Sequence, residues 1–150
     1  MDFFRAYIGK NFKLPFRTQE AQAEEARNFM PELLGSSDTY IFRHEGREYA
    51  LAWLTQVSPG RLEICSFVSA DAGEHIVSLF RAFKELLEMY MADPRFFRIE
   101  ATAKRGFSQG ERALRLLGFK HEGTLRKVFA KQDYELYSIV EGDDLWPGRQ

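Results

Sequence analysis

Few side chains with obvious chemical reactivity stand out in this chain of 150 residues. Its one cysteine, Cys65, could act as a nucleophile, but it lacks an obvious histidine or basic partner, and lone cysteines usually pack as small hydrophobes. The three histidines, His44, His75 and His121, are too widely separated for a metal-ligand motif, so we expect no metal site. His75 could donate to a phosphate or titrate near neutral pH, or it could simply be solvated in the first turn of a helix.

Two adjacent cations form the other notable group. Lys104 and Arg105 lie in the loop KRGFSQG and could meet phosphate groups. Long basic side chains are also mostly exposed in proteins, so simple solvation is the alternative interpretation. Neither interpretation is settled by the sequence itself.

The composition predicts one packed domain spanning residues 1–150. Hydrophobic residues make up 45% and aromatic residues 15% of the chain, which is too apolar for a disordered protein. The formal charge of −1 gives no global field that would recruit nucleic acid or a membrane surface. A single cysteine excludes an internal disulfide and fits a reducing compartment, so we expect a cytoplasmic protein. No apolar run is long enough for a membrane span.

Hydrophobic periodicity and turn residues predict a mixed α/β or α+β domain. We expect turns at Glu45-Gly46 and Pro59-Gly60, each between two strands. A long helix opens at Asp71 or Gly73 and ends before Pro94. The remaining expected elements are an N-terminal arm (1–15), a helix (18–35), strands (39–44, 47–57, 61–69, 95–103), a helix (111–118), a closing β-pair (119–129, 134–142) and a C-terminal tail (143–150).

The last predicted helix ends on a glycine followed by an aromatic. Gly118 can adopt the left-handed conformation that caps a helix C-terminus. Phe119 could then fold back onto the apolar face formed by Leu114, Leu116 and Leu117.

The segments ALRLLGFKHEGTLRK (113–127) and DYELYSIV (133–140) resemble the C-terminal end of the GNAT acetyltransferases. The similarity is to the branch that acetylates protein N-termini and ribosomal proteins. The matching residues are Leu117, Gly118, Phe119, Glu122, Gly123, Leu125, Arg126, Asp133, Tyr137 and Ser138. The resemblance implies a central mixed sheet of about six to seven strands, with helices on both faces and a splayed pair of parallel strands.

The same resemblance implies that acetyl-CoA binds where the parallel strands separate. Pantetheine would add beside strand 61–69 like an extra strand, with strand 96–103 opposite. The turn that follows strand 61–69 would hold the pyrophosphate with backbone N–H groups and a helix N-terminus. The cofactor-binding residues implied in this way are Phe67, Val68, Ser69, Gly73, Glu74, His75, Lys104 and Arg105.

Direct acetyl transfer to an amine needs a base to deprotonate that amine. The resemblance makes Glu63 the candidate base, although it could instead be an exposed strand residue or a partner for Arg61 or Arg98. Tyr137 is a second candidate for the site, because Tyr134 and Tyr137 could line an acceptor pocket. Strand alternation requires one of these two tyrosines to lie in the core.

Two functions remain open at this point. The first is an acetyl-CoA-dependent N-acetyltransferase that acts on an amine of a small molecule or a protein. The alternative is a catalytically inactive GNAT-like domain with a binding or structural role, as in similar phage-encoded proteins. It is favoured by Ile76 and Ser78 at positions that are usually glycine, and by the carboxylate of Glu74 near the expected phosphates. The aromatic N-terminus, with Phe3, Phe4 and Tyr7, could dock on the core or on a second copy of the chain.

Overall fold

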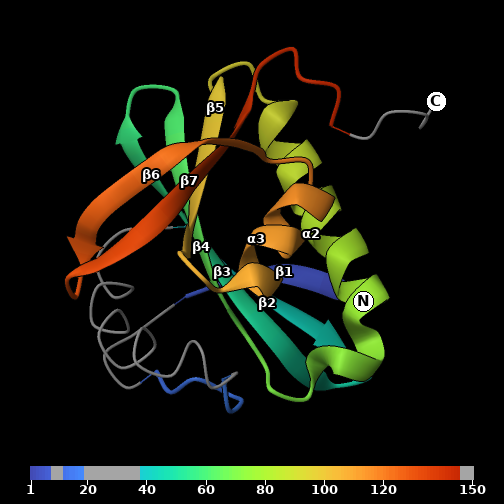
Figure 1. Ribbon diagram of the computed structural model, residues 1–150. Coiled ribbons are helices and arrows are strands. Elements are labelled where there is room, and N and C mark those ends of the chain that lie inside the picture. Colours follow the sequence, from blue (N-terminus) through green and yellow to red (C-terminus); the bar gives the residue numbers. More distant parts are fainter. Residues whose placement is uncertain (8–11, 19–37, 146–150) are drawn as a thin grey trace. The chain divides into compact units, whose positions relative to one another are not determined.

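The structure is a computed structural model that describes residues 1–7, 12–18 and 38–145 (Figure 1). The described part is a mixed α+β fold with one seven-stranded sheet of order β1-β2-β3-β4-β5-β7-β6, as predicted. The helix expected over 18–35 lies outside the described residues, apart from Thr18. The elements are β1 (Asp2–Ala6), β2 (Asp38–His44), β3 (Arg47–Ser58), β4 (Arg61–Val68), the 3₁₀ helix η2 (Ala72–His75), α2 (Ile76–Met91), β5 (Arg98–Lys104), α3 (Ser108–Leu116), β6 (Lys120–Phe129) and β7 (Gln132–Val140).

The chain divides into two compact units. The first comprises Met1–Thr55 and Ile64–Met89, and the second comprises Gln56–Glu63 and Tyr90–Gln150. Strands β3 and β4 and helix α2 each contribute residues to both units.

A hairpin forms the centre of the first unit. Strands β2 and β3 pair in antiparallel fashion around Glu45 and Gly46, whose φ angles are 50° and 78°. Two consecutive positive φ angles match the type I′ turn, which suits the twist of a two-residue hairpin. The predicted turn is therefore confirmed.

The sequence analysis did not predict strand β1. Residues expected to form part of an N-terminal arm pair instead with β2, from Asp2 opposite Arg43 to Ala6 opposite Thr39. Phe3 contacts the rings of Tyr40 and Phe42 at centroid distances of 5.9 and 5.6 Å. The N-terminus is thus an edge strand anchored by aromatic contacts.

The core of the first unit has apolar side chains on both faces of this hairpin. On one face Phe42 stacks on Phe83 of α2, with ring centroids 4.3 Å apart. On the other face lies a buried cluster of Ile41, Leu51, Trp53 and Phe67, against which Cys65 and the segment around Phe12, Leu14 and Phe16 pack. This two-sided cover explains the unbroken buried run from Tyr49 to Leu54 in β3.

The second unit is built on β5, β7 and β6. Strand β7 lies between the other two and pairs with both in antiparallel fashion. The parallel ladder of β4 with β5 contains three pairs, from Arg61 opposite Arg98 to Glu63 opposite Glu100. Strand β4 continues to Val68 and β5 to Lys104 after these pairs. The predicted splay of the two strands beyond the ladder stays a prediction.

Helix α3 contacts β5 and β6 in the second unit (Figure 1). It begins at Ser108, three residues before the predicted start, because Gly110 is helical and leaves room for the ring of Phe107. At its end Gly118 has a φ of 98°, and the N–H groups of Phe119 and Gly118 donate to the carbonyls of Leu114 and Arg115. This is the Schellman cap, so the predicted role of Gly118 is confirmed.

Strand β6, an edge of the sheet, departs from a regular ladder at two places. The register with β7 shifts between His121 and Gly123 and again between Leu125 and Phe129. Bulges of this kind are common on edge strands, where they re-aim side chains and hinder pairing with other chains. Beside the first bulge, Glu122 accepts hydrogen bonds from Ser138 of the adjacent β7 and from Arg98 of β5, the next strand beyond it.

Candidate active site

The turn after β4 is fixed by a hydrogen bond of its own and by two other segments of the first unit. The N–H of Ser69 donates to the carbonyl of Tyr49 at 2.8 Å, and the N–H of Ala70 donates to the carbonyl of Arg17 at 2.7 Å. The buried hydroxyl of Ser69 accepts the N–H of Asp71 at 3.1 Å. Ser69 therefore stabilises the turn through both its backbone and its side chain, and its N–H is already hydrogen-bonded to β3.

The residues after Ser69 lead directly into α2. Gly73 lies in η2 with no atom within 4 Å of the place where a Cβ would stand, and its φ is not positive. Neither packing nor conformation therefore requires a glycine there, and the backbone is open to close approach. Ile76 follows η2 in a right-handed helical conformation as the first residue of α2, so its branched side chain causes no backbone strain.

Charges around the turn are largely compensated. The carboxylate of Asp71 forms an ion pair with Arg47 at 2.7 Å. The ring of His75 packs between His44 and Tyr49, at centroid distances of 4.8 and 4.9 Å. Glu74 is exposed in the same turn. The N-terminus of α2, which is the positive end of its dipole, thus follows a turn that carries the exposed carboxylate of Glu74 and the imidazole ring of His75, which packs on that of His44.

The two strand residues predicted beside the cofactor have different environments. Phe67 is buried in the cluster with Trp53, with ring centroids 5.0 Å apart, so its side chain belongs to the core. Val68 is half-buried at the end of β4. Cys65 packs against the same cluster, as expected for a small hydrophobe.

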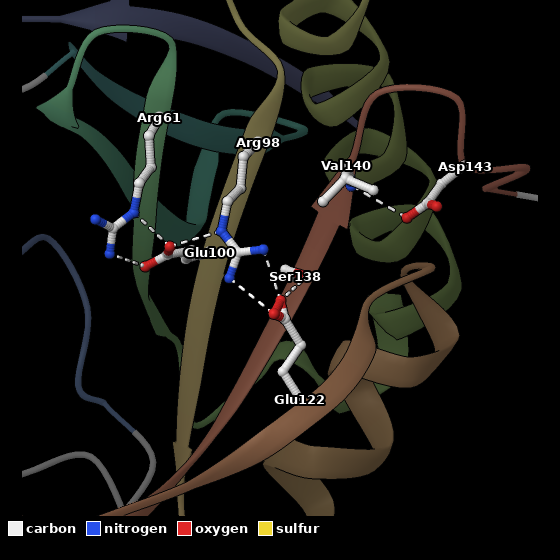
Figure 2. Close-up of polar contacts among 7 residues, drawn as sticks. All are labelled: Arg61, Arg98, Glu100, Glu122, Ser138, Val140 and Asp143. Carbon is white, nitrogen blue, oxygen red and sulfur yellow. Dashed lines mark hydrogen bonds and ion pairs between the residues drawn. The ribbon is translucent and has the colours of Figure 1, made fainter.

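In the second unit, a charged network crosses four strands, from Arg61 of β4 to Ser138 of β7 (Figure 2). Two nitrogens of Arg61 donate to the two carboxylate oxygens of Glu100, at 2.5 and 3.0 Å. Arg98 donates to Glu100 at 2.7 Å and to Glu122 at 2.9 Å. The hydroxyl of Ser138 donates to Glu122 at 2.5 Å. Arg61 and Arg98 are thus joined by Glu100, which Glu63 faces in the parallel ladder.

This network sets the protonation of its members. Hydrogen bonds from Arg61, and then from Arg98, lower the pKa of the buried Glu100. Hydrogen bonds from Arg98 and then Ser138 lower the pKa of Glu122. Both carboxylates are therefore ionised at neutral pH and are weak bases. The raised pKa of Arg61 comes mainly from its hydrogen bond to Glu100, with a smaller contribution from the charge of Glu63.

Tyr137 lies in the core of the second unit, with no exposed surface. Its hydroxyl donates to Glu111 of α3 at 2.9 Å, and Arg115 lies over its ring. Burial, followed by this hydrogen bond, raises the pKa of Tyr137, so the phenol stays neutral well above pH 7. Tyr134 is also buried, so both candidate acceptor-pocket tyrosines lie in the interior.

A second polar group lies beside Tyr137. Nε2 of His121 lies 2.6 Å from Glu135, and Thr124 donates to the same carboxylate. His121, and then Thr124, lower the pKa of Glu135. These contacts hold β6 on β7 on both sides of the first bulge.

The predicted cationic pair lies at the end of β5. Lys104 is the last residue of the strand, and Arg105 begins the turn to α3. The side chain of Arg105 is 66% exposed, and its guanidinium lies 3.6 Å from Asp133 and 3.9 Å from Glu135. The backbone N–H of Arg105 donates to the backbone carbonyl of Asp133 at 2.9 Å.

The structure thus groups the predicted residues by unit. Phe67, Val68 and the turn residues lie in the first unit, and Glu63, Tyr137, Lys104 and Arg105 lie in the second. Sequence reasoning missed the network in which Glu100, Glu122 and Ser138 join Arg61 and Arg98. One signal in the sequence could have indicated this network. Arg61 and Glu63 are two residues apart, as are Arg98 and Glu100, and residues at this spacing lie on the same face of a strand.

Two general features of the described residues bear on the site. No helix among them is long and apolar enough to cross a membrane. Within residues 1–7, 12–18 and 38–145, no three His, Cys, Asp or Glu side chains are grouped so that they could hold a metal ion.

The sequence matches no protein-family model and no curated protein. Solved structures of acetyltransferases, however, share its fold. A ribosomal-protein-alanine N-acetyltransferase from Brucella melitensis is 17% identical with a TM-score of 0.60, covering 81% of this chain and 77% of its own. RimL, a ribosomal L7/L12 α-N-protein acetyltransferase solved with coenzyme A, is 16% identical with a TM-score of 0.64, covering 81% and 74%. A GNAT-family acetyltransferase from Bacillus anthracis is 18% identical with a TM-score of 0.62, covering 78% and 74%. The fold of this chain is that of the GNAT acetyltransferases.

Proposed function

We propose that this protein is an N-acetyltransferase that moves an acetyl group from acetyl-CoA to an amine. The single observation that carries the proposal is the shared fold, whose solved examples include an enzyme in complex with coenzyme A. The short parallel ladder of β4 and β5 supports it, because both strands continue past their three pairs.

The residues of the first unit fit the phosphate end of this cofactor. The open backbone at Gly73 allows close approach of an anion, and α2 contributes the positive end of its dipole. Arg47 neutralises Asp71, which removes one of the two carboxylates that would repel a pyrophosphate. Glu74 remains as the unfavourable charge in this turn.

Acetyl-CoA would supply an activated thioester, and the chain would supply the base. In the proposed reaction the amine nitrogen forms a bond to the acetyl carbon, the carbon–sulfur bond breaks, and the thiolate leaves. Glu63, directly or through a water molecule, accepts the proton that the amine loses. The neighbouring Glu100 and Glu122 are held ionised by arginines and are too weakly basic for this role.

The acceptor is an amine of a small molecule or of a protein. Two of the structural neighbours act on ribosomal proteins, which makes a protein N-terminus a natural first substrate to test. Peptides with free and blocked α-amino groups would separate N-terminal from side-chain acetylation.

Binding of acetyl-CoA can be tested by thermal and chemical denaturation. At one hundred times its dissociation constant, a ligand that binds only the folded chain adds about 2.7 kcal/mol of stability. Gly73→Val should fold normally, because a Cβ at this position has no atom within 4 Å and φ is not positive, but should lose this stabilisation. Gly123→Val is the matched control, because Gly123 has equally open space and no positive φ.

The chemistry has its own test. Glu63→Gln should lower the acetylation rate by about 10² to 10⁴ fold while leaving acetyl-CoA binding intact. Absence of any stabilisation by millimolar acetyl-CoA would instead favour a catalytically inactive GNAT-like domain with a binding role. Full activity of Glu63→Gln, with binding retained, would keep the enzyme but exclude this base.

A further inference from the structure

The tip of the β6–β7 hairpin and the start of the β5–α3 turn form a basic pocket in the second unit. Its volume is about 330 Å³ and its lining residues are Arg105, Lys127, Lys131, Gln132 and Asp133. This volume suits a small ligand. The lining holds three cationic side chains and one carboxylate, so its formal charge at pH 7 is three minus one, or +2.

The cations of this pocket are available to a ligand. In the described part of the chain, neither Lys127 nor Lys131 has an acidic group within ion-pair distance of its ammonium. The guanidinium of Arg105 lies 3.6 and 3.9 Å from its two carboxylate neighbours, which is beyond normal hydrogen-bond length, and the side chain is 66% exposed. Its planar donors therefore retain hydrogen-bonding capacity.

The one carboxylate of the pocket is already used to shape it. Oδ1 of Asp133 accepts the backbone N–H of Lys127 at 2.8 Å, across the second bulge of β6. Its backbone carbonyl accepts the N–H of Arg105 at 2.9 Å. Asp133 thus holds together the segments that carry two of the cations.

The backbone of the pocket is strained where the lysines stand. Lys127, Ala130 and Lys131 have φ angles of 47°, 50° and 59°, which side-chain-bearing residues rarely adopt. The described residues contain only one other such non-glycine position, Glu45. Observed strain of this kind is a reason to look for function, because glycine would fold there more easily.

We propose that this pocket binds a compact phosphate-type dianion, such as the phosphate monoester of a small molecule. The net charge of +2 matches a dianion, and a guanidinium with two ammonium groups matches the oxygens of a tetrahedral phosphate. This site goes beyond the proposed acetyl transfer and does not rest on it.

Inorganic phosphate serves as the probe, with backbone amide NMR spectra of the full chain as the readout. Titration at millimolar concentrations should shift the amides of residues 127–133 in a saturable manner. Lys127→Gln with Lys131→Gln should weaken this binding about a hundredfold, since each lost contact is a charge-assisted hydrogen bond worth about tenfold in affinity. Arg112→Gln with Arg126→Gln is the control, because it removes the same charge from exposed positions outside the pocket.

Three outcomes would overturn the proposal. Shifts that are equally strong in the lysine double variant would show that phosphate binds elsewhere. A spectrum that phosphate does not change would show that the pocket has no such affinity. Displacement of phosphate by acetyl-CoA would assign the pocket to the cofactor and not to a separate ligand. Denaturation of each double variant checks that it is folded, and the proposed acetyltransferase function is tested independently by acetyl-CoA stabilisation.

Discussion

Both units of this protein have an apolar core, but the buried carboxylates among the described residues, Glu100 and Glu135, both lie in the second unit. In the first, aromatic and aliphatic side chains pack on both faces of the β2–β3 hairpin, and Phe42 stacks on Phe83. In the second, ion pairs and hydrogen bonds link neighbouring strands through Glu100, Glu122 and Glu135. Apolar packing responds little to pH, whereas ionic networks depend on it. The comparison therefore predicts that the stability of the second unit depends more on pH than that of the first.

The largest effect should come from the packing of the first unit. Phe42→Ala removes a fully buried ring and its stack on Phe83, so the free energy of unfolding should fall by about 3 to 5 kcal/mol. Urea denaturation gives this value. Tyr7→Ala is the control, because that side chain is 93% exposed and its loss should change stability by less than about 0.5 kcal/mol. Equal losses in both variants would mean that the stack contributes little.

Next in size is the loss of the shared carboxylate of the second unit. Glu100→Gln leaves two arginines without their common anion, so we expect a loss of about 2 kcal/mol in the free energy of unfolding. Glu85→Gln, at an exposed position of α2, should be nearly neutral in the same urea titration. A Glu100→Gln protein as stable as the parent would show that the network is replaceable by neutral hydrogen bonds.

Elements whose signals are local in the sequence were predicted well. Gly118 with Phe119 indicated a helix cap, and Glu45-Gly46 indicated a hairpin turn, because a few neighbouring residues decide both conformations. Strand β1 was missed because its short run of charged and apolar residues has no strand pattern of its own. It forms a strand by pairing with β2, which lies more than thirty residues away.

The residues of the candidate site show the same difference between local signals and long-range pairing. Glu63 could be named from the family resemblance, but Glu100 is separated from its partner Arg61 by 39 residues. Their meeting depends on the register of the β4–β5 ladder, which no local pattern specifies. The bulge that aims Glu122 at Arg98 depends likewise on pairing with β7.

The ionic network should also make the free energy of unfolding depend on pH in the acid range. The folded pKa values of Glu100 and Glu122 lie below the ordinary value of 4.5, because arginines bind the ionised forms. Their stabilisation is therefore complete above about pH 4.5 and is lost as the pH falls toward the folded pKa values. Glu122→Gln should make unfolding less sensitive to pH below this point, whereas Phe42→Ala should keep the parental pH slope. Parallel slopes for Glu122→Gln and the parent would exclude Glu122 as a source of the acid sensitivity.

The smallest effect compares the two hairpin turns, which both have positive φ angles at their two central residues but differ in the types of those residues. Glu45-Gly46 and Ala130-Lys131 both have two consecutive positive φ angles, and glycine occupies one position in the first turn alone. Lys131→Gly should therefore stabilise the fold by about 0.5 to 1 kcal/mol, because glycine adopts this conformation without a Cβ clash. The reciprocal Gly46→Lys should destabilise the fold by a similar amount, measured by urea denaturation of both variants. If Lys131→Gly gained stability and also lost phosphate affinity, the lysine would be retained for binding at the expense of the fold. A loss of stability in Lys131→Gly would show instead that the lysine side chain itself supports the turn.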